Sequence, residues 1–245
     1  MNDLSGEVRR LCVALDFEDP GGTSPLALDR AHRRLVDLVT EAGTRAGLDR
    51  LYLADRGADA SAGRNGETAG RDAARPDPDP QSGAFFLLPS GVNEARVVAG
   101  LTAELRVALR RRNQGLAPDS PRRLRLRAAF HQGPTRVEDS GFVGRAVDTV
   151  HRLRDAAEVR AELLRNPYAD LAVVLSAQLF EDVTEVEHRD LRRGLFRRLL
   201  VPSPIGVGEA WISLPGLDDP AHARPYATAR SHAGLITPPA AAGGR

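Results

Sequence analysis

One acidic residue is placed where it could do chemistry. Asp16 lies near the end of the apolar run RLCVALDF at residues 10–17, and a Pro-Gly-Gly break follows at residues 20–22. Alternating apolar residues in that run predict a strand. A carboxylate at the end of a buried strand can hold Mg²⁺, with the backbone carbonyl of Phe17 as a neighbouring ligand. Taken alone, such an Asp is more often a turn or cap residue.

A second group of polar residues lies in the segment 124–156, LRLRAAFHQGPTRVEDSGFVGRAVDTVHRLRDA. His131 ends a predicted strand, Gly144 follows a turn, and Asp148 and Arg152 stand four residues apart on a predicted helix. Arg is well suited to a charge-delocalised phosphate. Taken alone, His131 is expected at a site mouth or in solvent, and His151 is expected on the helix surface.

These residues need a scaffold, which the hydrophobic pattern supplies. Alternation predicts strands at residues 10–17, 50–54, 83–88, 122–132, 170–175, 193–201 and 208–214, and apolar residues at helical spacing predict helices at 26–42, 92–112, 145–157 and 177–182. Residues 158–165 are expected to continue the helix at 145–157. Up to residue 132 the order is strand, helix, strand, strand, helix, strand. That is the ferredoxin-like βαββαβ order of an α+β fold, with both helices on one face of an antiparallel sheet.

Together with this element order, the segment 124–156 resembles the catalytic domain of class III nucleotidyl cyclases, in particular the actinobacterial cyclase-homology proteins. That family typically shows a strand ending His-x-Gly, a glycine-containing turn, and Val-Asn-x-x-x-Arg-Leu on a helix. Here these features read His131-Gln132-Gly133, then Gly144, then VDTVHRL at residues 147–153. Asp16 takes the position of the family's first metal-binding Asp, and GAFFLLP at residues 83–89 fits the strand after its Gly-Asp-Gly hairpin.

The resemblance implies a definite chemistry. Two Mg²⁺ or Mn²⁺ ions bridge two Asp residues and the triphosphate of ATP or GTP, and the ribose 3′ hydroxyl attacks the α-phosphate. Arg152 would neutralise charge in the transition state, beside the catalytic Asn position, here Asp148. In head-to-tail homodimers these two residues come from the opposite subunit. Asp139 would serve as a base-reading acceptor, and Gly144 would lie against the substrate.

The sequence departs from this pattern in three places. The hairpin Asp-Arg-Gly begins correctly at residues 55–57 but then enters an insertion, residues 58–82, without large apolar residues, which predicts a disordered loop. The second metal Asp is therefore missing, with Asp55, Asp59 and Asp79 as alternatives. An acid, Asp148, replaces the neutral Asn, and the ATP-reading Lys is absent because the chain has no Lys.

These departures predict a catalytically impaired domain that acts as a nucleotide-binding or regulatory module with an unidentified protein partner. The alternative is an active purine nucleotide cyclase with a relocated metal carboxylate. A third hypothesis is a scaffold that binds no nucleotide. Deletion of residues 60–78 would separate the first two, because a loop that supplies a ligand is needed for activity.

Composition narrows the remaining classes of protein. The 245 residues carry 34 basic groups, all Arg, against 33 acidic ones, for a net charge of +1. Without Lys there is no Schiff-base enzyme and no P-loop, and the balanced charge argues against a nucleic-acid partner. The lone Cys12 predicts a buried reduced thiol. Neither a signal peptide nor a membrane span is expected, so we predict a cytoplasmic protein with one domain at residues 1–217 and a flexible tail at 218–245.

Overall fold

The computed structural model describes residues 7–18, 24–48, 52–53, 83–138, 141–185, 191–203 and 206–217. Its strands are β1 (Val8–Phe17), β2 (Tyr52–Leu53), β3 (Ala84–Leu87), β4 (Leu126–Glu138), β5 (Gly141–Val143), β6 (Leu171–Ser176), β7 (Arg197–Ser203) and β8 (Gly206–Ser213). Its helices are α1 (Pro25–Arg45), α2 (Glu94–Arg112), α3 (Arg145–Asp155), α4 (Ala157–Arg165) and α5 (Ala177–Thr184), with a 3-10 turn η3 (Arg193–Leu195).

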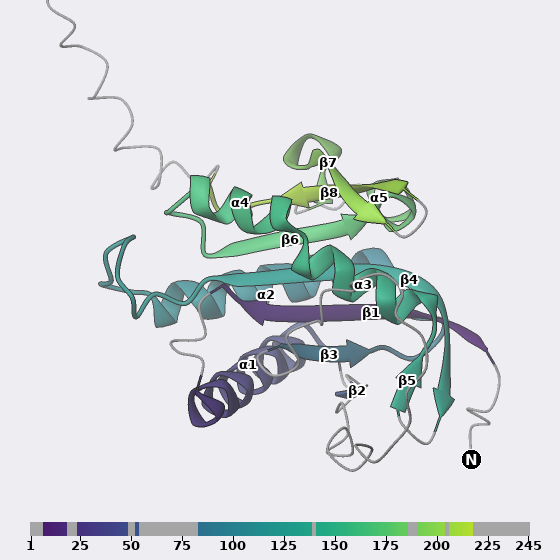
Figure 1. Ribbon diagram of the computed structural model, residues 1–245, viewed down its shortest axis with the longest axis horizontal. Coiled ribbons are helices and arrows are strands. Elements are labelled where there is room, and N and C mark those ends of the chain that lie inside the picture. The colour runs from purple at the N-terminus through teal and green to yellow at the C-terminus, as the bar shows by residue number, and fades with distance from the viewer. Residues whose placement is uncertain are drawn as a thin grey trace, which may run out of the picture.

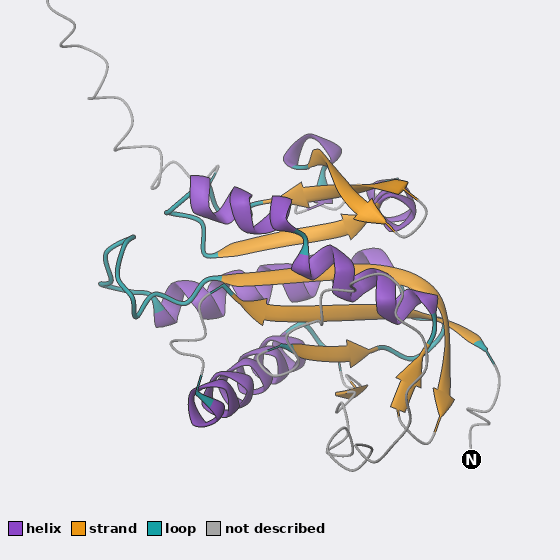
Figure 2. Ribbon diagram, in the orientation of Figure 1, coloured by secondary structure: helices purple, strands orange, loops and turns teal. Residues whose placement is uncertain are grey.

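Seven strands form one twisted sheet in the order β2-β3-β1-β4-β6-β8-β7, and β5 pairs with the far end of β4 (Figure 2). The first four positions, β2-β3-β1-β4, are the ferredoxin-like arrangement that the element order predicts. All pairings along the path are antiparallel except β4 with β6, which run parallel. The α+β class and the βαββαβ core are confirmed.

Helices cover both faces of the sheet, so the expectation of helices on one face holds only for the βαββαβ unit. Odd-numbered residues of β1 and even-numbered residues of β4 pack with α1, α2 and α5 in one core. The alternate residues of the same strands pack with α3 and α4 in a second core. Figure 1 shows α3 and α4 in front of the sheet and α2 behind it. Because both faces are covered where the end of β1 meets the start of β4, the polar side chains there, Asp16 and Arg127, are buried.

Local signals explain where the long helices begin. Ser24 caps α1 by accepting a hydrogen bond from the backbone N–H of Ala27 at 3.3 Å, and Pro25 takes the first helical position, where proline is favoured. Asn93 caps α2 in the same way, accepting from Arg96 N–H at 2.8 Å. The predicted continuous helix after residue 145 is wrong in detail. Ala156 is extended, with φ −57° and ψ 131°, and separates α3 from α4.

One further local prediction needs correction. The strand predicted to end at residue 132 runs on to Glu138, and only residues 136–138 of this extension pair with β5. Ser176 precedes α5, and its side chain makes no cap hydrogen bond.

Candidate functional site

The site is built around Asp16, at the carboxyl end of β1. Asp16 faces the α3 side of the sheet and is only 8% exposed. Its direct partner across the antiparallel pair is Arg127 of β4. The pairing therefore places a guanidinium beside the carboxylate that the sequence marks as a metal ligand.

Arg127 is 2% exposed and ties three segments together. Its Nη2 lies 2.9 Å from Asp16 Oδ2, and its Nε lies 3.2 Å from Glu18 Oε2. Its Nη1 donates a hydrogen bond to the backbone carbonyl of Arg154, the residue before the last in α3, at 3.3 Å. One buried cation thus contacts two carboxylates and the end of a helix. Figure 1 shows α3 crossing β1 and β4 in this region.

The electrostatics of the cluster balance closely. Arg160 of α4 lies 3.4 Å from Glu18 Oε1, so two carboxylates face two guanidiniums. Burial raises the pKa of Glu18 above its ordinary value, and the nearby guanidinium of Arg127 opposes that rise. Burial likewise lowers the pKa of Arg127, while Asp16 and Glu18 act in the opposite direction. Arg127 stays charged because arginine in proteins keeps its proton.

A second buried guanidinium, that of Arg154, lies next to the start of β3. Arg154 is 5% exposed and holds Asp155 through two hydrogen bonds of 2.7 and 2.8 Å. A methyl group added at Gly83 would collide with the Arg154 guanidinium and would lie 2.9 Å from the Leu15 carbonyl oxygen. Gly83 therefore makes room for Arg154 between β3 and β1, at the end of the hairpin that the resemblance equips with a metal ligand.

These residues are a poor fit for Mg²⁺ or Mn²⁺. A divalent cation prefers several carboxylate and carbonyl oxygens around an open position. The described part of the chain holds no cluster of three or more His, Cys, Asp or Glu that could bind a metal. Asp16 and Glu18 instead share the guanidinium of Arg127. A metal ion at Asp16 would have to displace a positive charge that is already buried there.

The two helical candidates lie elsewhere. Asp148 is exposed and Arg152 half-buried, whereas Val150, Leu153 and Arg154 face the sheet. Residues four apart share one side of a helix, so Asp148 and Arg152 lie together on the outer side of α3. Neither side chain has a hydrogen bond or ion pair with any residue that the structure describes. The structure thus separates this pair from the buried cluster at Asp16.

Gly144 begins α3, and its backbone explains why a glycine stands there. Its φ is +134°, a conformation that side chains disfavour, and a Cβ would come within 2.9 Å of the Pro134 carbonyl oxygen. This packing requirement exists without any substrate. The structure shows no ligand for Gly144, so its substrate-binding role stays a prediction.

Of the remaining candidate site residues, one is buried in the core and the others lie outside the described residues. Phe17 is buried in the core that α1 and α2 share, and it pairs with Leu126 at the end of β1. A ligand role for its carbonyl remains a prediction. Asp139, Asp55, Asp59 and Asp79 lie outside the described residues, as does most of the insertion at 58–82.

Both histidines of the segment are more buried than the sequence suggests. His131 is half-buried, and its Nδ1 lies 2.8 Å from Ser176 Oγ. Burial lowers its pKa from 6.5 to about 4, so His131 is neutral at pH 7. His151, expected at the surface, is 7% exposed and packs on Phe85 with ring centroids 5.1 Å apart. The covered second face of the sheet is the reason for both corrections.

Sequence reasoning missed three residues of the cluster, Glu18, Arg127 and Arg154. A signal for two of them was present. Arg127 alternates with Ala129 on the strand face opposite the recognised apolar face, and Arg154 continues the helical stripe of Ala146 and Val150. Recognising a second covered face would have predicted that both arginines are buried. For Glu18, beyond the end of the strand, no such pattern exists.

At the level of sequence, no family model and no curated protein matches the chain. Structural comparison does find proteins of similar fold. The crystal structure of the guanylyl cyclase Cya2 is similar with a TM-score of 0.50 at 14% identity, over 85% of this chain and 92% of that one. An adenylate/guanylate cyclase/hydrolase from Silicibacter pomeroyi is similar with a TM-score of 0.51 at 18% identity, over 85% of this chain and 99% of that one.

At these identities the likeness concerns the fold. The chain has the fold of adenylate and guanylate cyclase domains, as the resemblance of segment 124–156 implies. It is thus a nucleotidyl cyclase-like domain by architecture. Among the helices that the structure describes, none has the length and apolar character needed to cross a bilayer.

Proposed function

We propose that this chain is a divergent class III cyclase-homology domain that binds a purine nucleoside triphosphate without converting it to a cyclic product. It would act as a regulatory or interaction module in the cytoplasm. The observation that carries the proposal is the ion pair of 2.9 Å between Asp16 and the buried Arg127. A carboxylate that is neutralised by an internal cation is a weak ligand for a second one.

The cost of displacing Arg127 from Asp16 favours a domain that does not cyclise its nucleotide over one that cyclises it slowly. Breaking a buried ion pair by removing one partner typically costs about 3–5 kcal/mol, and displacement of Arg127 by a metal ion would meet a similar cost. The acid at Asp148 adds repulsion toward a triphosphate. Loss of one well-placed electrostatic donor lowers kcat by about 10²–10³-fold in known enzymes, and here several features act in the same direction.

Arg152 is the residue proposed to contact the phosphates. Its place on the outer side of α3, without a partner in the described part of the chain, leaves its guanidinium available to a ligand held between two subunits. A head-to-tail homodimer would present it to the partner's nucleotide. A divalent cation, Mg²⁺ or Mn²⁺, would then arrive with the triphosphate and would not depend on Asp16.

The test is calorimetric titration with ATP and with GTP, each with Mn²⁺ and with EDTA, followed by chromatography of the recovered nucleotide. The proposal expects binding in both conditions, intact triphosphate, and at least tenfold weaker binding for Arg152→Gln, since a charge-assisted contact is worth about 1.5–3 kcal/mol. Asp16→Asn should bind as the wild type does. A cyclic product that disappears in Asp16→Asn would establish the active cyclase instead. No binding would establish a scaffold.

A further inference from the structure

A pocket of about 430 Å³ lies at the C-terminal end of α2, and none of the residues of the Asp16 cluster lines it. Its walls come from the end of α2, the segments that lead into β4 and β6, and the turn after β8. The lining includes Asn113, the four arginines Arg106, Arg110, Arg111 and Arg123, and a single carboxylate, that of Asp170. Four arginines against one carboxylate leave a formal excess of three positive charges.

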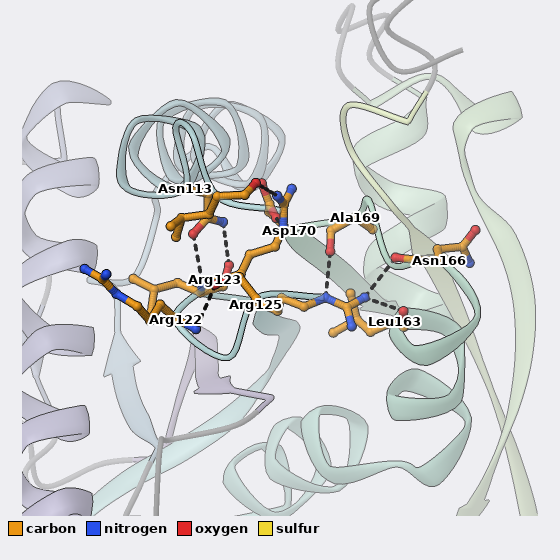
Figure 3. Close-up of polar contacts among 11 residues, drawn as sticks. Asn113, Arg122, Arg123, Arg125, Leu163, Asn166, Ala169 and Asp170 are labelled. Atoms are coloured by element: carbon orange, nitrogen blue, oxygen red, sulfur yellow. Dashed lines mark hydrogen bonds and ion pairs between the residues drawn. The ribbon is translucent and has the colours of Figure 1, made fainter. Parts of the chain in front are cut away.

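Hydrogen bonds hold the walls of this pocket in place. The Asn113 side chain makes two bonds of 2.8 Å with the backbone of Leu124, one as donor and one as acceptor. Arg123 Nε lies 2.7 Å from Asp170 Oδ1, and its Nη1 donates to the Leu116 carbonyl at 3.3 Å. Figure 3 shows Arg123 between the end of α2 and Asp170. The site is therefore formed before any ligand arrives.

The helix dipole does not account for the whole set of arginines. Cations in the last turn of a helix are favoured by the dipole, which explains Arg110 and Arg111. Arg106 lies more than one turn earlier, and Arg123 belongs to a different segment. The side chains of Arg106 and Arg111 form no hydrogen bond or ion pair with the described residues. Guanidiniums from separate segments thus converge on one pocket, and two of them have no anionic partner there.

We infer that this pocket binds a small molecule that carries a diphosphate or two phosphate groups. Guanidinium forks match phosphate oxygens in geometry and charge. The volume exceeds the needs of a single phosphate and falls in the range of small-molecule pockets, about 300–1,000 Å³. The single carboxylate is already paired, and no His, Ser or Cys lines the walls, so the pocket binds its ligand without reacting with it. The inference is independent of the proposed nucleotide function.

The test uses inorganic pyrophosphate without metal, titrated calorimetrically into the full chain. One molecule should bind per chain, more weakly as salt rises. Arg106→Gln and Arg111→Gln should each weaken binding by about 10–100-fold, because each removes a charge-assisted contact. Arg96→Gln is the matched control, an exposed arginine in the first turn of the same helix, and should bind as the wild type does.

A second variant tests the charge balance in the opposite direction. Asp170→Asn removes the only carboxylate and releases Arg123, so pyrophosphate should bind more tightly, by about tenfold. A purely structural role for the pocket residues would give no such gain. The inference is overturned by absence of binding, by equal losses in Arg96→Gln and Arg111→Gln, or by duplex DNA that binds the same arginines more tightly than pyrophosphate does at equal salt.

Discussion

Substitution of Arg127 by Leu is the sharpest test of how the cyclase-like fold has been altered. The change keeps an apolar stem in the second core but removes the guanidinium that faces Asp16 at 2.9 Å and Glu18 at 3.2 Å. Two carboxylates would then be buried without that cation. Breaking a buried pair costs about 3–5 kcal/mol. For a domain of this size each kcal/mol lowers Tm by about 2–4 °C, so Tm should fall by about 6–20 °C.

Urea unfolding followed by the fluorescence of Trp211, the one tryptophan, gives the free energy directly. Trp211 stacks on Phe180 with ring centroids 4.1 Å apart, so its environment reports the loss of the core. Arg122→Leu is the matched control: an exposed arginine close by, whose removal should change stability by no more than about 0.5 kcal/mol. The double variant Arg127→Leu, Asp16→Leu should recover much of the loss, because replacing both partners of a buried pair is often neutral.

The single variant Arg127→Leu should also gain affinity for a metal ion. With Arg127 absent, Asp16 and Glu18 form an acidic site, and Mn²⁺ at 100 times its Kd would restore about 2.7 kcal/mol of stability. The wild type should show no Mn²⁺ effect through these residues. The reasoning fails if Arg127→Leu unfolds within 1 kcal/mol of the Arg122→Leu control, or if Mn²⁺ stabilises wild type and variant alike.

Three further predictions concern other buried groups. The His131 pKa of about 4 lies below the ordinary 6.5, so as the pH falls the unfolded chain takes up a proton before the folded one does. The free energy of unfolding should therefore drop between pH 6.5 and 4, by at most about 3 kcal/mol. In urea titrations at several pH values His131→Asn should lose less stability over this range, and parallel curves would contradict the assignment. In Gly83→Ala the added methyl group would press against Arg154 and would lie 2.9 Å from the Leu15 carbonyl oxygen. This variant should lower the free energy of urea unfolding by about 1–3 kcal/mol. The control Gly91→Ala, which has a strained backbone but no atom within 4 Å of its methyl group, should lower it less. Burial raises the pKa of Cys12 to about 12, so a chromogenic disulfide reagent should react with it only in denaturant, and rapid reaction of the native protein would refute the buried thiol.

Much of the fold follows from local pattern. Periodicity predicts α1 and α2 and most strands, because a half-covered surface imposes period 3.6 on a helix and period 2 on a strand. The second covered face was missed because alternation reveals one apolar face at a time. Ala129 and Arg127 share the less apolar face of β4, and nothing local says that α3 and α4 return to cover it.

The candidate site was predicted less completely. Asp16 was found from its position at a strand end, but its partner Arg127 lies 111 residues away in sequence and is fixed only by the β1–β4 register. Arg154 is buried because Gly83 leaves space beside β1. Such pairings depend on long-range geometry that a single sequence does not display. Asp148 and Arg152 needed only helical spacing, so their placement on one side of α3 could be predicted.

Arginines gather at the end of the sheet where β1 finishes and β4 begins. Asp16, which the resemblance assigns to metal binding, lies at this end. Three arginines lie at two-residue intervals where the chain leads into β4, and each binds a different part of the protein. Arg123 holds Asp170 before β6, Arg125 donates to the carbonyls of Leu163 in α4 and of Asn166 and Ala169 after it, and Arg127 holds Asp16 and Glu18 at the end of β1 (Figure 3 shows the first two). Guanidiniums of the chain itself thus connect this end of the sheet to β1, to α4 and to the segment before β6. Each of the three is therefore expected to stabilise the fold, Arg127 most strongly because it is the most buried.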